Sequence, residues 1–266
     1  DVIAPFIPPS REGDKITGRG SVDDKGNVAA ICGALKIIEV LAAGGEIQLK
    51  NRITAMFPVE EETGGNGSLA LALDRELKKR YESMLVMECA DNRVYPANRG
   101  AVWFRSELTR ASSGAVNFNL LEAVAYAVLE MQEEGAAIKS ESDHPLFPHR
   151  PVQTCNGILG PYGEHPSRIN GLIRFRIMDF NSGSIKDIES AVERGVMKFV
   201  SRYGDRTTII DPATGVPKVK RHVDIDRSKA DELVIAVHGS TGHMGAILEN
   251  DDAIVKWACI ACELVE

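Results

Sequence analysis

The N-terminal part of the chain alternates between helical and strand-like spacing of apolar residues. From Asn27 to Leu41 the apolar positions recur at helical spacing, and the pair Gly44-Gly45 ends this pattern. Ser68 to Leu77 predicts a second helix, whereas the apolar runs Arg52 to Val59 and Met84 to Met87 are typical of buried strands. This order of strand, helix and strand predicts a largely parallel sheet with flanking helices.

After Gly100 the pattern changes. Apolar and polar residues alternate in the strand that contains Ile173, Phe175 and Ile177, which indicates a sheet with one solvent-facing side. Three amphipathic stretches predict helices, at Asn117 to Met131, Ile185 to Val200 and Asp252 to Val265, and Leu233 to Val237 predicts a further strand. The second half is therefore expected to be an antiparallel sheet backed by helices. We place the boundary between two α/β domains at residues 105 and 106.

Composition narrows the classes of partner. The chain has 266 residues, a formal net charge of -7 and a sequence pI of about 5.5. No basic stripe is present, which argues against nucleic acid and anionic membrane surfaces as partners. No apolar run approaches the roughly 20 residues of a membrane span, and no signal peptide opens the sequence.

Cysteine usage gives a weaker signal. The five cysteines are scattered and odd in number, so no disulfide framework is expected. Cys259 and Cys262 form a single CxxC inside an apolar helical pattern, which favours a structural role. Together these features favour a cytoplasmic location.

The first acidic cluster lies in the segment GRGSVDDKG, residues 18–26, directly before a predicted helix. Its glycine spacing fits neither a P-loop nor a dinucleotide fingerprint, and adjacent carboxylates would repel a phosphate. Glycines that flank an acidic residue instead indicate a tight backbone around a cation. The alternative is that Asp23 or Asp24 is simply the N-cap of the helix.

Two further acidic groups follow predicted strands. The segment EEETGG, residues 60–65, comes directly after the run that ends at Val59, and Glu88 ends the second run. Consecutive carboxylates beside an apolar strand are costly unless a positive charge compensates them, as a divalent metal would. The alternatives are a solvated acidic loop for the first group and an ordinary turn residue for Glu88.

These motifs, in this order, resemble the M20 zinc peptidases and deacylases, a family that includes acetylornithine deacetylase, succinyl-diaminopimelate desuccinylase, carboxypeptidase G and carnosinase-like dipeptidases. The family pattern runs through GRGxxDxKG and EExG to a strand-end acid about a dozen residues before a Lys/Arg-Gly pair, matched here by Glu88 and Arg99-Gly100. The resemblance implies a partial catalytic domain over residues 1–105. It also implies a ferredoxin-like lid domain over residues 106–266, through which the protein would form a homodimer.

The resemblance also implies site residues. Asp23 would bridge two zinc ions, which cobalt or manganese could replace, while Glu62 would ligate one ion and Glu88 the other. Glu61 would be the general base. Asp1 matches an Asp that orients the family's first metal-binding His. That His precedes the position of Asp1 by two residues in the family, and a second His ligand is not identified, so we expect a fragment that lacks both ends.

A histidine near the C-terminus remains open between three interpretations. The segment HGSTGHMGA, residues 238–246, resembles the lid segment of the family, in which His243 would stabilise the oxyanion of the tetrahedral intermediate. His243 could instead be the terminal metal ligand, or a turn residue without a catalytic role. His238 is expected to be structural.

The predicted function is therefore hydrolysis of an amide bond by a two-metal site with a Glu general base. The substrate would be a small peptide or an N-acyl amino acid, so dipeptidase, carboxypeptidase and deacylase activities all remain open. The alternative is a non-catalytic metal-binding or regulatory module that keeps the M20 fold.

Overall fold

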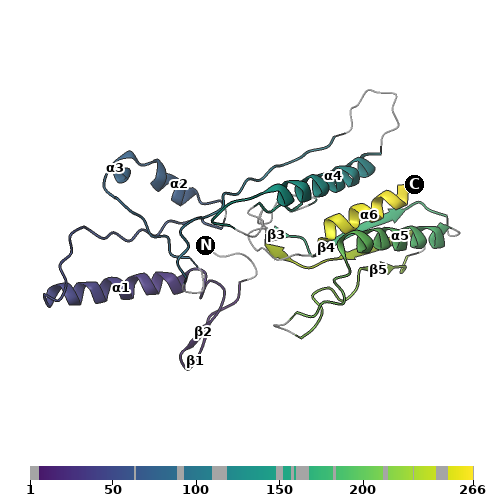
Figure 1. The fold of residues 1–266 in the computed structure, drawn as a ribbon. Helices are drawn as coiled ribbons and strands as arrows, with labels where there is room; N and C mark the ends of the chain where they lie inside the picture. The colour runs from purple at the N-terminus through teal and green to yellow at the C-terminus, as the bar shows by residue number, and fades with distance from the viewer. Residues whose placement is uncertain are drawn as a thin grey trace. The chain divides into compact units, whose positions relative to one another are not determined.

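The computed structural model describes residues 6–62, 64–88, 93–109, 119–147, 152–156, 159, 168–181, 184–211, 215–229, 231–243 and 251–265. They belong to two compact units, Asp1–Asn98 and Arg99–Glu266, drawn from purple to yellow along the chain in Figure 1. The division lies a few residues before the boundary expected from the sequence. The assignment of the units as catalytic and lid domains stays a prediction.

The first unit contains a short hairpin and three described helices. The hairpin pairs β1 (Ser10–Glu12) with β2 (Lys15–Thr17), and the helices are α1 (Lys25–Ala43), α2 (Asn66–Leu73) and α3 (Arg75–Lys78). The predicted helix over Asn27 to Leu41 is confirmed as α1. It ends as expected, because Gly45 has a positive φ of 75° and the Gly44 N–H donates to the carbonyl of Val40 at 2.9 Å.

The predicted helix over Ser68 to Leu77 is divided by Asp74. This residue has extended backbone dihedrals, and its carboxylate accepts hydrogen bonds from the N–H groups of Glu76 and Leu77. An Asp in this position is a favourable N-cap, so it ends α2 and begins α3.

The parallel sheet expected in the first unit is not confirmed. The segments 52–59 and 84–87 have no ladder partner among the described residues, and every described strand pair is antiparallel. A side-chain hydrogen bond from the Tyr81 hydroxyl to Thr54 Oγ1, at 3.0 Å, links the neighbourhoods of the two segments. An apolar run indicates a tendency to extend, but the hydrogen-bonded neighbour of a strand depends on long-range pairing, which the run does not encode.

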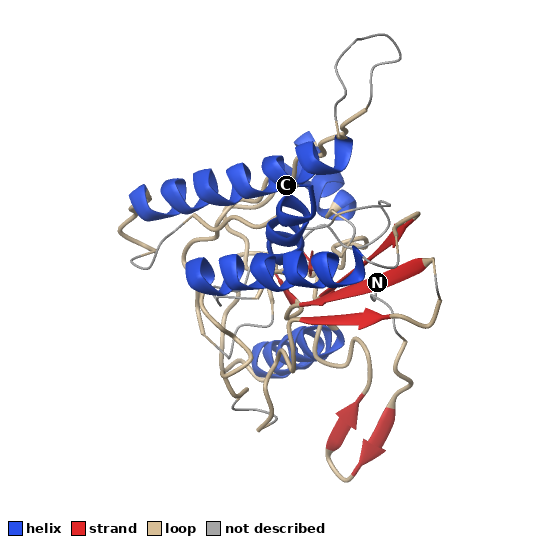
Figure 2. Cartoon of the chain, turned by 90° about the vertical axis from the view of Figure 1, so that its right-hand side faces the viewer, coloured by secondary structure: helices blue, strands red, loops and turns tan. Residues whose placement is uncertain are grey.

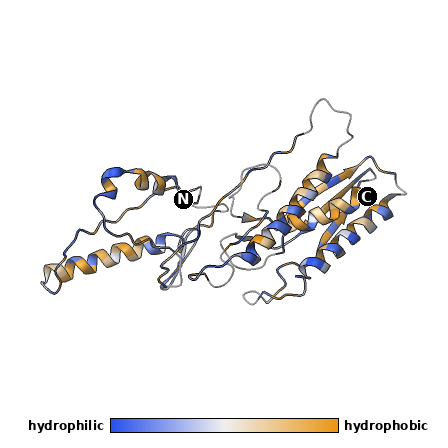
Figure 3. Cartoon of the chain, turned by 45° about the horizontal axis from the view of Figure 1, so that its top comes forward, coloured by the Kyte–Doolittle hydropathy of each residue, from blue (hydrophilic) through white to orange (hydrophobic). Residues whose placement is uncertain are grey.

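Helix α1 is apolar along its length (Figure 3) but contains no buried residue. Its 19 residues are long and apolar enough, by length and composition, to cross a membrane, a test that core helices also pass. The expectation that the protein has no membrane partner therefore stays a prediction.

The second unit contains a three-stranded antiparallel sheet, as the alternating pattern predicted. Its order is β4 (Leu172–Met178), β6 (Glu232–His238) and β5 (Val223–Asp226), shown in red in Figure 2. The apolar residues Leu233, Ile235 and Val237 of β6 point to the same face and are buried. A separate pair joins β3 (Arg168–Ile169) to β7 (Gly242–His243).

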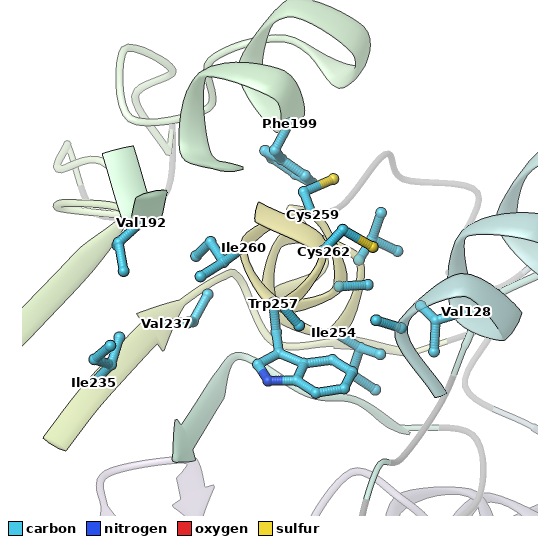
Figure 4. Close-up of a cluster of buried hydrophobic side chains, with 14 residues drawn as sticks. Val128, Val192, Phe199, Ile235, Val237, Ile254, Trp257, Cys259, Ile260 and Cys262 are labelled. Carbon is cyan, nitrogen blue, oxygen red and sulfur yellow. The ribbon is translucent and has the colours of Figure 1, made fainter. Parts of the chain in front are cut away.

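Three helices complete the second unit: α4 (Leu120–Glu141), α5 (Ile185–Tyr203) and α6 (Ala253–Val265). Every residue of α6 from Ala253 to Glu263 is buried, and side chains of α4, α5 and β6 surround this helix (Figure 4). Val192 and Phe199 of α5 lie in this core. Cys259 and Cys262 also lie in this core, and burial raises the pKa of Cys259 to about 11.

Helices α5 and α6 cross in close contact at Gly195. A Cβ at this position would lie 2.4 Å from the Cα of Ile260 and 2.8 Å from its backbone nitrogen. Because the obstacle is backbone rather than a flexible side chain, only glycine permits this separation of the helices.

We expect Gly195→Ala to lower the free energy of unfolding by about 1–3 kcal/mol, because overpacking outweighs the better helix propensity of alanine. Chemical denaturation followed by the fluorescence of buried Trp257 measures the change. The matched control is Gly33→Ala in α1, where a Cβ meets no atom within 4 Å. Unchanged stability of Gly195→Ala would contradict the close crossing.

Glu263 is a buried carboxylate with two cationic partners. Lys198 forms an ion pair with it, and Arg194 Nε donates to its Oε2 at 2.7 Å. The hydrogen bonds from Lys198 and then Arg194 hold the pKa of Glu263 below its usual value of 4.5.

A lowered carboxylate pKa stabilises the fold above the unfolded-state value, and this contribution is lost as pH falls through the folded-state value. Near neutral pH we expect Glu263→Gln to lower the free energy of unfolding by about 1.5–3 kcal/mol, as for hydrogen bonds to charged groups. The difference from wild type should shrink below pH 4.5. Urea denaturation across this range measures it, with Glu193→Gln, an exposed carboxylate of α5, as control. A difference that does not depend on pH would refute this account.

Candidate metal centre

The loop that carries Asp23 is shaped by two glycines that follow the β1–β2 hairpin. Gly18 has a φ of 151°, and a Cβ there would lie 3.0 Å from the Cα of Pro9. Gly20 is buried with a φ of 80°, and its carbonyl accepts the N–H of Lys25 at 3.1 Å. The backbone of the loop therefore folds back on residues 7–9, which precede β1, and leads directly into α1.

Asp23 and Asp24 lie at the junction of this loop with α1, and the peptide bond between them is cis. Asp24 occupies the N-cap position, but its side chain accepts no backbone N–H of the helix. It accepts a hydrogen bond from Asn27 Nδ2 at 2.6 Å instead. The interpretation of this residue as an ordinary helix cap therefore accounts for its position but not for its hydrogen bonding.

The second acidic segment forms a tight turn before α2. The Gly65 N–H donates to the carbonyl of Glu60 at 2.7 Å, and Glu60 and Gly65 both have positive φ. Gly67 in the first turn of α2 packs against this segment, because a Cβ there would lie 2.4 Å from the carbonyl oxygen of Val59. The turn thereby fixes the backbone on both sides of Glu61 and Glu62.

Three carboxylates from two separate segments come together in this unit. One oxygen each of Asp23, Asp24 and Glu88 lies within 4.8 Å of the others. Asp23 and Glu88 are two of the three metal ligands expected from the sequence. They are 65 positions apart in the sequence (88 − 23).

Glu62, the third expected ligand, lies in a cavity of about 220 Å³ that Asp23 also lines. Ile7, Val22, Arg19 and the backbone around Ser21 form the rest of its wall. Glu62 is therefore near Asp23, but it does not belong to the group of three converging carboxylates. Asp23 is common to the group and to the cavity.

The other expected site residues are placed less completely. Glu61 is exposed in the 60–65 turn next to Glu62 and does not line the cavity. Asp1 lies outside the described residues. The backbone of His243 belongs to β7 in the second unit, where it pairs with Arg168, and its side chain is not described.

Asp24 is the residue that sequence reasoning missed as a candidate ligand. Its only signal was its position next to Asp23, and adjacent side chains normally point in different directions. The local backbone decides that both carboxylates face Glu88.

The group fits a divalent cation. Two oxygens on one zinc ion, with bonds of about 2.0–2.2 Å, lie at most about 4.4 Å apart, and the three oxygens here all lie within 4.8 Å of one another. Three carboxylates at this distance repel one another, and a cation removes this repulsion. The described donors of the group are all oxygens, a set that also suits manganese.

We expect Asp23→Asn and Glu88→Gln each to weaken the binding of zinc at least about tenfold, because each removes a charged donor. Isothermal titration with Zn²⁺ alone measures the affinity. Asp14→Asn, in the exposed turn of the hairpin, is the matched control and should bind zinc as the wild type does. If all three variants bind zinc equally, these carboxylates are not the metal site.

Comparison with known proteins finds relatives that match part of the chain. A peptidase M20 domain-containing protein of Schizosaccharomyces pombe is 34% identical over 100 residues, which cover 38% of this chain and 24% of the relative. Probable carboxypeptidases of Trichophyton verrucosum and Aspergillus fumigatus are 31% and 32% identical over 114 and 116 residues, or 39% of this chain in each case.

These matches cover 24% and 25% of the two carboxypeptidases, so the matched stretch is about a quarter of the length of these relatives. No solved structure matches the chain. The sequence model of peptidase family M20/M25/M40 matches residues 1–258, nearly the whole chain. The chain belongs to the M20/M25/M40 family of peptidases.

Proposed function

We propose that this protein is a metal-dependent hydrolase of amide bonds, in which Glu61 is the general base and Asp23, Glu62 and Glu88 hold two metal ions. The observation that carries the proposal is the convergence of Asp23 and Glu88 with Asp24, to within 4.8 Å, in a chain of a peptidase family. A helix cap or a solvated turn would not require carboxylates from distant segments to meet.

The position of Glu62 supports the same site. It lines the cavity beside Asp23, so a metal held by Asp23 would lie next to a space that can admit part of a small substrate. Arg19 contributes a positive charge to the same wall. Glu61 directly precedes Glu62 in a turn whose backbone is held by hydrogen bonds, and this adjacency supports its proposed role as the second carboxylate of the site.

Each residue of the proposed site has a separate role. A pair of divalent ions held by these carboxylates would supply Lewis acidity for the scissile carbonyl and would lower the pKa of water. Glu61 removes the proton of the attacking water as the new C–O bond forms. It then gives this proton to the nitrogen of the leaving amine as the C–N bond breaks. Asp24 would add its negative charge beside a cation held by Asp23, and its contact with Asn27 orients its side chain.

For the second unit we propose the role of a lid and dimerisation domain. Its elements β4, α5, β5, β6 and α6 follow the order strand, helix, strand, strand, helix, with the first strand beside the third, as in part of a ferredoxin-like fold. His243 follows β6 in this unit. We propose that it stabilises the oxyanion of the tetrahedral intermediate, with terminal metal ligation as the rival role.

The substrate class rests on the relatives. Two of those described above are named probable carboxypeptidases, and we propose a small peptide as substrate on that ground. N-acyl amino acids share the same scissile amide and a neighbouring carboxylate, so they form the second class to be assayed.

The test is Glu61→Gln, which keeps the shape of the side chain but removes the base. We expect kcat for amide hydrolysis to fall by about 10²–10⁴-fold, while the affinity for zinc stays within a factor of about two, because general-base catalysis contributes rate rather than metal binding. Release of the free amine from dipeptides, C-terminally free peptides and N-acyl amino acids gives the rate.

Glu60→Gln is the matched control, since it changes the neighbouring carboxylate in the same turn and should retain the rate of the wild type. Equal rates for Glu61→Gln and the wild type would remove Glu61 as the base. Zinc binding without hydrolysis of any of these substrates by the wild type would favour a non-catalytic metal-binding module.

A further inference from the structure

The chain between β6 and α6 is closed at its base by a pair of reciprocal hydrogen bonds. The Ser240 N–H donates to the carbonyl of Asp251 at 2.8 Å, and the Asp251 N–H donates to Ser240 Oγ at 2.9 Å. Both residues are buried. Ser240 and Asp251, which precede and follow the connection that carries His243, are thus joined by two hydrogen bonds in the core.

A buried lysine reinforces this closure. Lys256 on α6 has no exposed surface, and its Nζ lies 2.7 Å from Asp251 Oδ1. The same ammonium donates to the carbonyl of His238 at 2.6 Å and lies 4.9 Å from the ring centroid of Phe199. Lys256 therefore connects the last residue of β6 to the residue near the start of α6. Burial lowers its pKa, and the nearby carboxylate of Asp251 opposes this shift.

Two glycines allow the backbones to approach at this point. A Cβ at Gly239 would lie 2.3 Å from the carbonyl oxygen of Asp251, and one at Gly171 would lie 2.9 Å from the backbone nitrogen of Thr241. The Gly239 N–H also donates to the carbonyl of Gly171 at 2.8 Å. Glycine is therefore needed at both positions, because a side chain at either one would collide with the facing backbone.

The same segment is held again two residues further on. His243 and Gly242 form β7, which pairs with Arg168 and Ile169 of β3. The backbone of His243 is therefore fixed from two directions, by β3 on one side and by the closure at Ser240 on the other.

A buried ion pair contributes little net stability, because the free energy of removing its two charges from water offsets their attraction. Well-packed apolar residues often stabilise a core as well or better. The benefit of the ion pair is directional. The Lys256 ammonium can contact the carbonyl of His238 and the carboxylate of Asp251 together only when both groups lie at defined positions around it. Apolar contacts have no such directional requirement, so they would define the relative positions of His238 and Asp251 less closely.

We propose that Ser240, Asp251 and Lys256 form a clamp that fixes the base of segment 241–250 and thereby acts as a positioning device for His243. The clamp itself stands on the contacts above, whereas its catalytic consequence rests on the proposed function. None of the three residues touches the substrate in this proposal.

Hydrogen–deuterium exchange of the whole protein tests the clamp without reference to activity. Ser240→Ala removes one hydrogen bond and leaves the ion pair intact, so the protein should still fold. We expect the amides of Thr241, Gly242 and His243 to exchange about five- to tenfold faster, as for the loss of one buried hydrogen bond, with unchanged exchange in α5. Ser201→Ala, whose exposed hydroxyl bonds only within α5, is the matched control. Unchanged exchange of these three amides in both Ser240→Ala and Asp251→Asn would overturn the clamp.

Kinetics then test the consequence for His243. With zinc supplied, Ser240→Ala should lower kcat for amide hydrolysis about five- to tenfold and leave KM unchanged, since a displaced His243 affects the transition state rather than substrate binding. Faster exchange with an unchanged kcat would refute the positioning of His243. If the wild type hydrolyses no amide substrate, the proposed function and the role of His243 fail, and the exchange data still decide whether the clamp exists.

Discussion

The burial of α6 from Ala253 to Glu263 is the constraint on which the second unit depends. A helix that is apolar on all sides must be covered on all sides, and α4, α5 and the sheet provide this cover. Its two buried charges do not break the rule, because Lys256 meets Asp251, and Glu263 meets cations that extend from α5. The tight crossing at Gly195 and the closure beside Ser240 both follow from the need to bring other elements against this one helix.

The candidate metal centre in the first unit depends on a different constraint. Helix α1 buries no residue, so the carboxylates are not positioned by a core around that helix. They are positioned by backbone geometry: glycines in unusual conformations, a folded-back loop and a turn closed by hydrogen bonds. The mutual repulsion of Asp23, Asp24 and Glu88 is then the physical reason to expect a cation. Membership of a peptidase family is the reason to expect that such a cation takes part in hydrolysis.

Local structure was predictable where it depends on local chemistry. Helical spacing located α1, α5 and α6, and the alternation around Phe175 identified the antiparallel sheet with one exposed face. The motifs around Asp23 and Glu62 identified the family, because spacing within a loop is a property of the chain itself. The division of one predicted helix at Asp74 was missed, although an Asp that caps the next helix is a local signal that closer reading would have found.

The sequence by itself determined the positions of α1, α5 and α6, the alternation of the second sheet and the acidic motifs of an M20 peptidase, since these are set by spacing and residue type. Only the tertiary structure decided that Asp24 joins Asp23 and Glu88 while Glu62 lines the adjacent cavity, and that the runs at 52–59 and 84–87 have no ladder partner among the described residues. It also decided that Lys256, which resembles a surface residue in the sequence, is buried at the base of the His243 segment. Such outcomes depend on contacts between segments that are distant in the sequence. The free energy of these contacts is set by the packing of the whole chain and not by any one motif.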